Sequence, residues 1–216
     1  MYLRNFTRYP PPMKIFVYAF FLLLVPLQSF SQEDMFAQSR FSAKLLPMAF
    51  YPGFAGPSVR VSMEYKLKNN ISLENEAGLF FYYSKGYTAG MELKYYTNEY
   101  NLTGGRYFSA EFFYKTQAYP AADSISTGII HFDVNKNVEC LTFKYGNMKV
   151  YDSGFIFEAF TGLGVRIQQN HNSLSPEENG QLSGGKFQEN RILQQAGNRV
   201  YPNFVASIKI GWRLKG

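Results

Sequence analysis

A strict two-residue alternation near the C-terminus limits the fold of this chain more than any other feature. Over residues 204–214 the even positions are all apolar: Phe204, Ala206, Ile208, Ile210, Trp212 and Leu214. The odd positions carry two cations and otherwise neutral side chains: Val205, Ser207, Lys209, Gly211 and Arg213. Because successive side chains of a strand point to opposite faces, this segment predicts a β-strand with one apolar and one charged face.

The same alternation recurs earlier, so the chain is expected to form eight antiparallel strands. The expected strands cover residues 41–48, 58–67, 71–83, 87–96, 106–118, 138–147, 153–168 and 204–214, of which the first is the weakest. Residues 68–70 and 84–86 predict tight turns, since Asn and Gly tolerate positive φ. Residues 119–137 and 169–199 predict long polar connections. Two alternatives stay open there: residues 128–134 could extend a strand, and residues 186–195 could hold a helical turn.

The charges indicate which face of each strand is inside. The faces assigned as apolar in the second to eighth strands carry no charged residue, as expected of a lipid-facing surface where a cation costs ~2–4 kcal/mol. The opposite faces carry eight cations and six anions, expected to form a charge network in the lumen by pairing between neighbouring strands: Arg60, Glu64, Lys66, Glu74, Glu76, Glu92, Lys94, Glu111, Lys115, Lys144, Glu158, Arg166, Lys209 and Arg213.

The interior of such a barrel is expected to be closed, because eight strands leave room only for side chains. Glycines on the inner faces would make room for bulky neighbours such as Phe80 and Phe113: Gly90, Gly162, Gly164 and Gly211. A set of tyrosines near strand ends is expected to form interfacial girdles: Tyr82, Tyr83, Tyr87, Tyr95, Tyr96, Tyr100 and Tyr107.

Residues 41–214 therefore predict an all-β, eight-stranded antiparallel up-and-down transmembrane β-barrel. The pattern resembles the small eight-stranded outer-membrane barrels typified by OmpX and the transmembrane domain of OmpA. This resemblance implies the outer membrane of a Gram-negative bacterium, external loops, lipid as a partner, and recognition of residues 204–214 by the barrel-assembly machinery. In the resembled family the last strand ends on an aromatic residue, whereas here Trp212 is followed by four more residues.

The N-terminal segment has the pattern of a secretory signal peptide. Lys14 precedes an apolar run over residues 15–27, and small or polar residues follow it up to Gln32. A membrane-spanning helix would need ~20 apolar residues, and Pro26 interrupts this run before that length. We therefore expect residues 1–32 to be a signal peptide, with translation starting at Met1 or, as the favoured alternative, at Met13, and residues 33–216 to be the barrel.

Charge and cysteine content exclude some classes of function. The net charge of +6 falls to +3 when Arg4, Arg8 and Lys14 are removed with the first 32 residues (6 − 3 = 3), which argues against a nucleic-acid partner. Cys140 is the single cysteine, so no intramolecular disulfide can form, and we interpret it as a small structural residue.

Catalysis and metal binding find little support in the residues. His131 lies two residues before Asp133, and His171 lies two residues before Ser173. His131 with Asp133 on the same strand face invites comparison with the Ser/His/acid site of lipid A deacylase, an eight-stranded enzyme, but lacks the serine two residues after the histidine. His171 has that serine but falls in the predicted polar connection. Two distant histidines and one cysteine do not make a metal site. We therefore expect no enzyme activity, no cofactor and no metal.

The predicted role is structural, or surface contact with an unknown ligand through residues 119–137 and 169–199. The alternatives are a lipid-modifying hydrolase of the outer membrane, a small pore, and a secreted soluble barrel that binds an apolar ligand.

Overall fold

The computed structural model describes residues 40–47, 58–68, 70–81, 84–97, 104–125, 128–182 and 196–214. The chain divides into two units, Met1–Ala37 and Gln38–Gly216, and all described residues belong to the second. The predicted signal peptide, residues 1–32, lies outside the described residues and stays a prediction.

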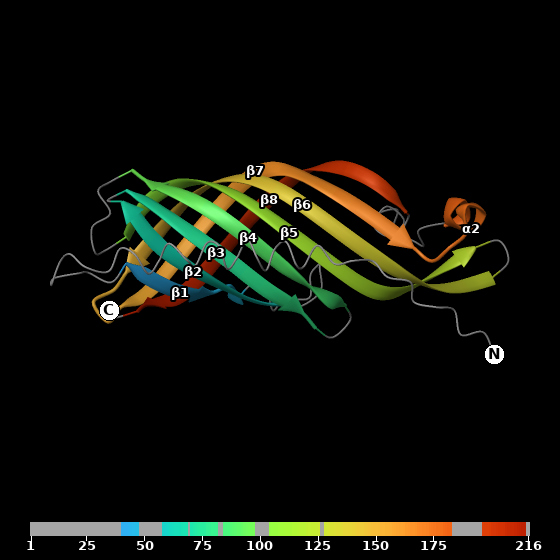
Figure 1. Cartoon of the computed structure of the whole chain (residues 1–216), viewed down its shortest axis with the longest axis horizontal. Helices are drawn as coiled ribbons and strands as arrows, with labels where there is room; N and C mark the ends of the chain where they lie inside the picture. The colour runs from blue at the N-terminus through green and yellow to red at the C-terminus, as the bar shows by residue number, and fades with distance from the viewer. Residues whose placement is uncertain are drawn as a thin grey trace. The chain divides into compact units, whose positions relative to one another are not determined.

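The described residues form eight strands and one short helix. They are β1 (Phe41–Leu45), β2 (Ser58–Lys68), β3 (Ile71–Phe80), β4 (Lys85–Tyr96), β5 (Gly104–Ile125), β6 (Gly128–Val150), β7 (Phe155–Asn172), α2 (Pro176–Gln181) and β8 (Gly197–Arg213). Each strand pairs antiparallel with its sequence neighbours, and β1 pairs with β8, so the sheet closes into a barrel (Figure 1). The predicted all-β, eight-stranded antiparallel fold is therefore confirmed.

The closing seam between β1 and β8 is short. Only four residue pairs join these strands, from Ser42 opposite Arg213 to Leu45 opposite Ile210. By contrast, β5 and β6 pair continuously from Gly104 opposite Lys149 to Ile125 opposite Gly128. The seam therefore has far fewer backbone hydrogen bonds than the longest strand pair.

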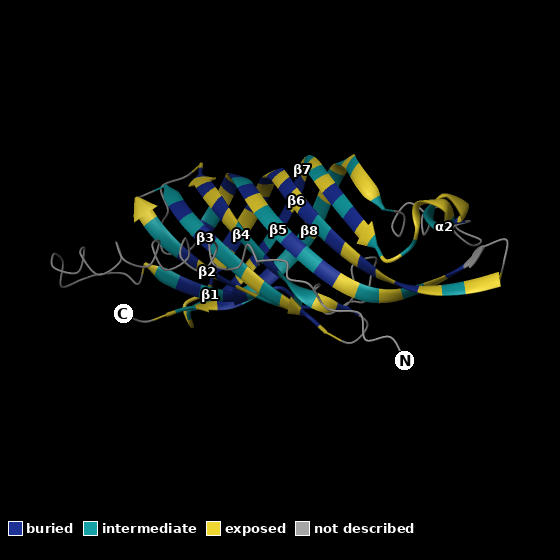
Figure 2. Cartoon of the chain, turned by 45° about the vertical axis from the view of Figure 1, so that its right-hand side comes forward, coloured by how far each residue is buried: buried dark blue, intermediate teal, exposed yellow. Residues whose placement is uncertain are grey.

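Burial alternates along the strands and appears as bands in Figure 2. The outward side chains are apolar and strongly exposed, as in Leu79 (66%), Phe143 (64%) and Phe204 (75%). The inward side chains include buried ions such as Glu158 and Lys209. The barrel thus has its apolar surface outside and its ionic groups inside.

The β5–β6 hairpin corrects one expectation about the connections. Residues 119–137 were expected to form a long polar loop, but β5 runs to Ile125 and β6 begins at Gly128. The alternative, strand extension over residues 128–134, agrees with this pairing. A strand that projects beyond the barrel is paired by its partner's backbone and needs no continuous apolar face, which is why its polar sequence resembled a loop. We call the end of the barrel from which this hairpin projects the hairpin end. The opposite end, at Arg213, is the C-terminal end.

The segment between β7 and β8 contains the helix α2. Ser175 caps it: the Ser175 hydroxyl accepts from the Glu178 backbone N–H, and the Glu178 carboxylate accepts from the Ser175 backbone N–H, with Pro176 in the first turn. The option of a helical turn over residues 186–195 lies outside the described residues. Strand structure also extends to Asn172 in β7 and starts at Gly197 in β8, so the predicted connection 169–199 is shorter than expected.

No helix among the described residues is long and apolar enough to cross a membrane.

An apolar cluster fills the lumen towards the C-terminal end. Its buried members are Tyr96, Tyr107, Met148, Val150, Ile156 and Phe160. Tyr96 and Tyr107 were expected in an interfacial girdle, and that expectation is wrong for both, because they lie on the inward parity of β4 and β5. Tyr95 is exposed and Tyr87 half-buried, while Tyr82, Tyr83 and Tyr100 lie outside the described residues.

Small inner positions accommodate these side chains. Gly146 lies directly opposite Tyr107, and a Cβ atom there would lie 2.4 Å from the Tyr107 ring. Gly90 similarly faces Phe113, whose Cβ would lie 3.0 Å from an added Cβ. The absence of a side chain at Gly146 is therefore required for the buried position of Tyr107.

We predict that Gly146→Ala destabilises the barrel by ~1–3 kcal/mol, because Tyr107 is buried and cannot move without losing its hydrogen bond. The matched control is Gly180→Ala on α2, where an added Cβ meets nothing within 4 Å. Urea unfolding in detergent micelles, followed by fluorescence of the single tryptophan Trp212, measures both variants. Equal stability of the two variants would contradict the packing argument.

Candidate functional site: a buried charge network

A row of four glutamates lies across one wall of the barrel. Glu64, Glu74, Glu92 and Glu111 stand directly opposite one another on β2, β3, β4 and β5. Each points inward because the alternation places its apolar neighbours outside. Like charges directly opposite one another in a sheet are destabilising. This row therefore requires cations that reach it from elsewhere in the barrel.

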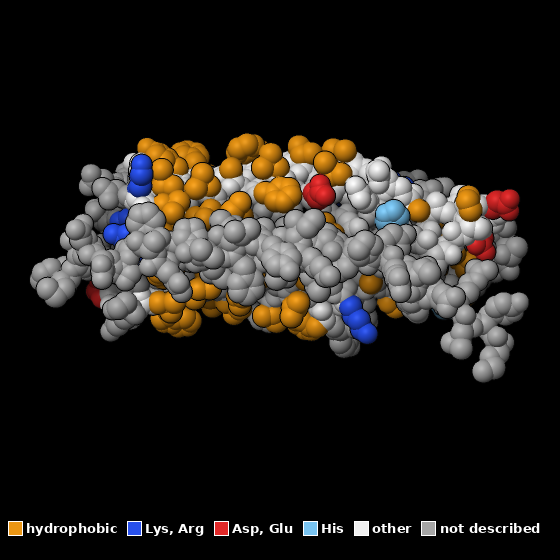
Figure 3. All heavy atoms as spheres, viewed as in Figure 1, with side chains coloured by type: hydrophobic (Ala, Val, Ile, Leu, Met, Phe, Trp, Pro, Cys, Tyr) orange, Lys and Arg blue, Asp and Glu red, His pale blue; other side chains and the backbone are white. Residues whose placement is uncertain are grey.

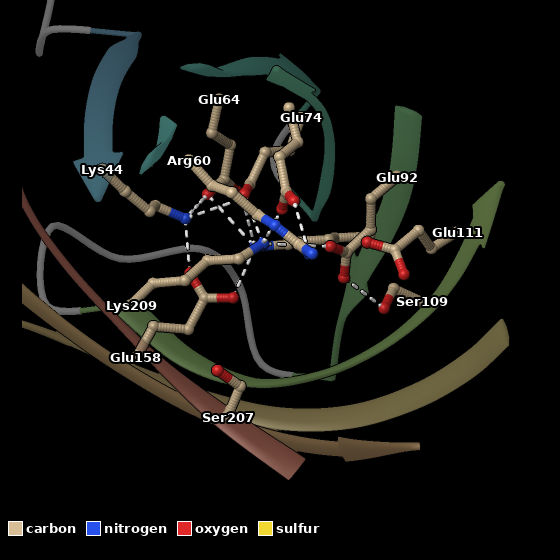
Figure 4. Close-up of polar contacts among 12 residues, drawn as sticks. Lys44, Arg60, Glu64, Glu74, Glu92, Ser109, Glu111, Glu158, Ser207 and Lys209 are labelled. Carbon is tan, nitrogen blue, oxygen red and sulfur yellow. Dashed lines mark hydrogen bonds and ion pairs between the residues drawn. The ribbon is translucent and has the colours of Figure 1, made fainter. Parts of the chain in front are cut away.

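Lysines from other strands supply these cations (Figure 4). From β8, the Lys209 Nζ atom lies 2.5 Å from a Glu74 carboxylate oxygen and 3.3 Å from Glu92. From β6, the Lys144 Nζ atom lies 2.6 Å from Glu111 and 3.1 Å from Glu92. Three of these four contacts, all except Lys144 to Glu111, join strands that are not neighbours in the barrel, so they run across the lumen.

A second part of the network centres on Glu158 of β7. Its carboxylate forms ion pairs with Lys44 from β1 and with Lys94 from β4, the latter at 2.6 Å. Lys44 and Lys94 each also contact Glu64 and Glu74. Glu64, Glu74 and Glu158 lie close enough together to resemble a metal-binding triad. The two ammonium groups already occupy the position between them, which makes a cation site there redundant.

Hydroxyl groups satisfy the remaining acceptors of this network. Tyr96 donates to Glu64 at 2.6 Å, Tyr107 donates to Glu158, and Ser109 donates to Glu92 at 2.6 Å. Five glutamates and four lysines leave one excess negative charge (5 − 4 = 1), and these hydrogen bonds help to stabilise it. Lys44, Lys94 and Glu158 have fully buried side chains, so this part of the network lies out of contact with water.

The predicted site residues fall into three groups along the lumen. Glu64, Glu74, Glu92, Lys94, Glu111, Lys144, Glu158 and Lys209 meet in the network just described. Arg60, Glu76, Lys115 and Arg166 lie nearer the hairpin end, with Arg60 and Glu76 3.6 Å apart. Lys66 and Arg213 lie half-buried near the C-terminal end. The expected pairing between neighbouring strands holds for Lys144 with Glu111 and Lys94 with Glu74, but the glutamate row shows that neighbours also repel.

Sequence reasoning missed Lys44 and the hydroxyl donors of the network, among them Tyr96 and Tyr107. Lys44 was left out because its strand is short and weakly patterned, although Ser42 and Lys44 alternate with Phe41, Ala43 and Leu45 in the sequence. Tyr96 and Tyr107 were assigned to the interface by residue type. The two-residue alternation places both tyrosines on the inward face. Tyr96, for example, follows Lys94 by two residues and so lies on the same face of its strand.

Glu139 is a charged residue on the outer face of β6, and the apolar face assigned to that strand from the sequence did not include it. Glu139 is exposed on β6, opposite Tyr114 of β5 and Ile167 of β7. The next residue, Cys140, and Thr142 face the lumen side, where the Cys140 sulfur lies 3.5 Å from the Thr142 hydroxyl. Glu139 therefore marks an edge of the apolar surface on this strand.

The candidate catalytic histidines are not assembled into a site. His131 and His171 are both exposed, and in the part of the chain that the structure describes neither imidazole ring forms a hydrogen bond with a hydroxyl or carboxylate. Ser173 instead accepts a hydrogen bond from the backbone N–H of Asp133 at 3.2 Å. The expected absence of enzyme activity stays a prediction.

Comparisons of this chain with protein-family models, with curated proteins and with solved structures found no match.

We predict that Lys209→Met lowers the free energy of unfolding by ~3–5 kcal/mol, because it leaves the buried carboxylates of Glu74 and Glu92 with excess charge. Adding Glu74→Gln should recover part of this loss by removing one of them. Lys149→Met, which removes a lysine from the exposed face of β6, should change stability by less than ~0.5 kcal/mol. Urea titration of all three variants is the measurement, and a Lys209→Met barrel as stable as Lys149→Met would argue against a tightly coupled network.

Proposed function

We propose that this protein is an integral outer-membrane β-barrel of a Gram-negative bacterium. In this proposal the barrel is a closed structural element of the membrane, and its hairpin end contacts surface ligands or partners. The observation that carries the proposal is the inverted distribution of polarity, with ions sealed inside the barrel and apolar side chains around the outside.

The apolar belt supports a lipid environment. Each of β2 to β8 contributes outward apolar side chains, and one example from each strand is at least half exposed: Met63, Leu79, Leu93, Phe108, Phe143, Leu163 and Phe204. Figure 3 displays this belt as orange side chains along the barrel. Contiguous exposed apolar surface of this extent marks a membrane or a large partner surface. Outward charges such as Lys68, Lys85, Arg106 and Lys149 lie at strand ends, where a membrane surface would accommodate them.

The proposed orientation follows from the connections. The start of β1 and the end of β8 share the C-terminal end, which would face the periplasm and leave residues 204–214 available to the barrel-assembly machinery. The hairpin end would then be external. The β5–β6 hairpin and α2 lie together there (Figure 1), and they would form the surface-contact region.

The alternatives receive less support from the described residues. A carrier of an apolar ligand needs an apolar interior, whereas this lumen is filled by ion pairs. A pore needs a continuous water path, whereas Lys44, Lys94 and Glu158 are fully buried across the lumen. A lipid hydrolase needs an oriented histidine base, and both histidines are exposed without a partner among the described residues.

We predict that the membrane fraction contains this protein as a heat-modifiable band, because a folded barrel resists detergent until it is boiled. Phe143→Arg should destabilise the membrane-inserted barrel by ~2–4 kcal/mol, since it places a cation in the lipid-facing belt. Ile129→Arg is the matched control, because Ile129 is even more exposed (74%) but lies on the projecting hairpin. Recovery of the protein in the soluble fraction, or equal effects of the two variants, would overturn the membrane assignment.

We also predict that the purified protein forms no stable channels in planar bilayers, because the charge network closes the lumen. Conductance recordings at neutral pH measure this directly. Long-lived open channels from the unmodified protein would favour the pore alternative instead.

A further inference from the structure

A second set of ions lies in the lumen between the buried network and the hairpin end. It comprises Arg60 of β2, Lys115 of β5, Lys136 of β6 and Arg166 of β7, which we call the cation cluster. The register places Arg60 and Lys115 in one row of the wall, linked through Gly78 and Thr88. Lys136 lies two residues closer to the hairpin end than this row, at the next inward-facing position of β6. Arg166 lies two residues further from the hairpin end than this row, at the next inward-facing position of β7.

Two of these cations are buried close to one another without a carboxylate partner. Lys115 and Lys136 are 7% and 6% exposed, and no described carboxylate lies within 4 Å of either ammonium group. The Lys115 ammonium lies over the Phe80 ring at 5.0 Å, and the Arg60 guanidinium faces the same ring at 5.8 Å. Arg60, Lys136 and Arg166 all repel the charge on Lys115.

The charge of the cluster is not balanced by the described residues. Its only ion pair is that of Arg60 with Glu76, so four cations face one carboxylate and three positive charges remain (4 − 1 = 3). The connections at this end whose structure is not described are residues 48–57, 82–83, 126–127 and 183–195. Their sequences contain a single acid, Glu189, which is too few to neutralise three cations.

Hydrogen-bonding groups in the same region also lack partners. The Arg166 Nε atom, the Gln168 Oε1 atom, the Tyr201 hydroxyl and the Ser62 hydroxyl are buried without a hydrogen bond to the described residues. Arg166 and Tyr201 stand directly opposite each other on β7 and β8. A buried polar group without a partner costs ~1–3 kcal/mol. The region thus combines unbalanced positive charge with unused donors.

We propose that the cation cluster binds a phosphate group. Inorganic phosphate or a phosphate monoester carries about 1.5 to 2 negative charges near neutral pH and several acceptor oxygens, so it matches three excess cations better than a single carboxylate does. The guanidinium Nε–H and the Tyr201 hydroxyl can donate to it, while Lys115 and Lys136 supply charge.

Part of this level of the lumen stays exposed, on the side of β2 and β3. The Arg60 and Glu76 side chains retain 22% and 12% exposure, whereas the Lys44 and Lys94 side chains in the network below retain none. A ligand can therefore approach the cluster beside Arg60 and Glu76, whereas Lys136, Gln168 and Asn170 are buried and the network closes the lumen below. Free phosphate and a lipid phosphate would present the same chemistry here, and the proposal holds in either case independently of the membrane assignment.

The test uses the folded full-length barrel in detergent micelles. Inorganic phosphate is titrated by calorimetry against chloride at equal ionic strength, and micelles doped with phosphatidic acid are compared with micelles doped with diacylglycerol. Lys115→Gln and Arg166→Gln are the test variants, with Lys136→Gln as a third if either fails to fold. Lys149→Gln is the control, because it removes the same charge from the outer face.

We expect at least one phosphate probe to bind the unmodified protein and to raise its unfolding midpoint. Lys115→Gln and Arg166→Gln should each weaken binding roughly tenfold or more, while Lys149→Gln should bind as the unmodified protein does. Without phosphate, Lys115→Gln should be at least as stable as the unmodified barrel, because it removes repulsion. The proposal is wrong if neither probe binds more strongly than its control, or if Lys149→Gln weakens binding as much as Lys115→Gln.

Discussion

The direct opposition of four glutamates on neighbouring strands is the constraint on which the rest of this barrel depends. A sheet that carries Glu64, Glu74, Glu92 and Glu111 in one row cannot close on itself without cations, because a buried uncompensated carboxylate is too costly. Lys209 and Lys144 reach that row from β8 and β6, and Lys44 reaches it from β1. The electrostatic requirement thus ties together strands that share no backbone hydrogen bonds.

The same requirement explains why the apolar side chains are outside. An eight-stranded barrel has room for one layer of inward side chains, and here ions and hydroxyls fill the middle of that layer. Residues such as Phe143 and Leu163 are then left on the outer surface, where water would be a poor solvent for them. Polarity inside and hydrocarbon outside are two results of one alternation, and the proposed lipid environment would suit both.

The sequence predicted what depends on alternation and failed where another factor decided the structure. Lys209 and Trp212 were assigned to opposite faces correctly, because their strand is long and its parity unambiguous. The polar side chains of the β5–β6 hairpin indicate a loop, yet its backbone pairs fully from Ala118 to Ile125. Lys44 was missed because five residues carry too little pattern. The partners of each ion depend on the three-dimensional closure of the ring, which no single strand encodes.

The short seam between β1 and β8 has a consequence for how the chain reaches this state. Lys44 and Glu158 are 114 residues apart in sequence, and Lys209 and Glu74 are 135 apart. Contacts of such high sequence separation form late and slow the folding rate. Until β1 meets β8, the lysines that neutralise the glutamate row are not all in place, so an open sheet leaves ionic charge exposed. Folding of this barrel is therefore expected to be cooperative, with ring closure as its last and rate-limiting step.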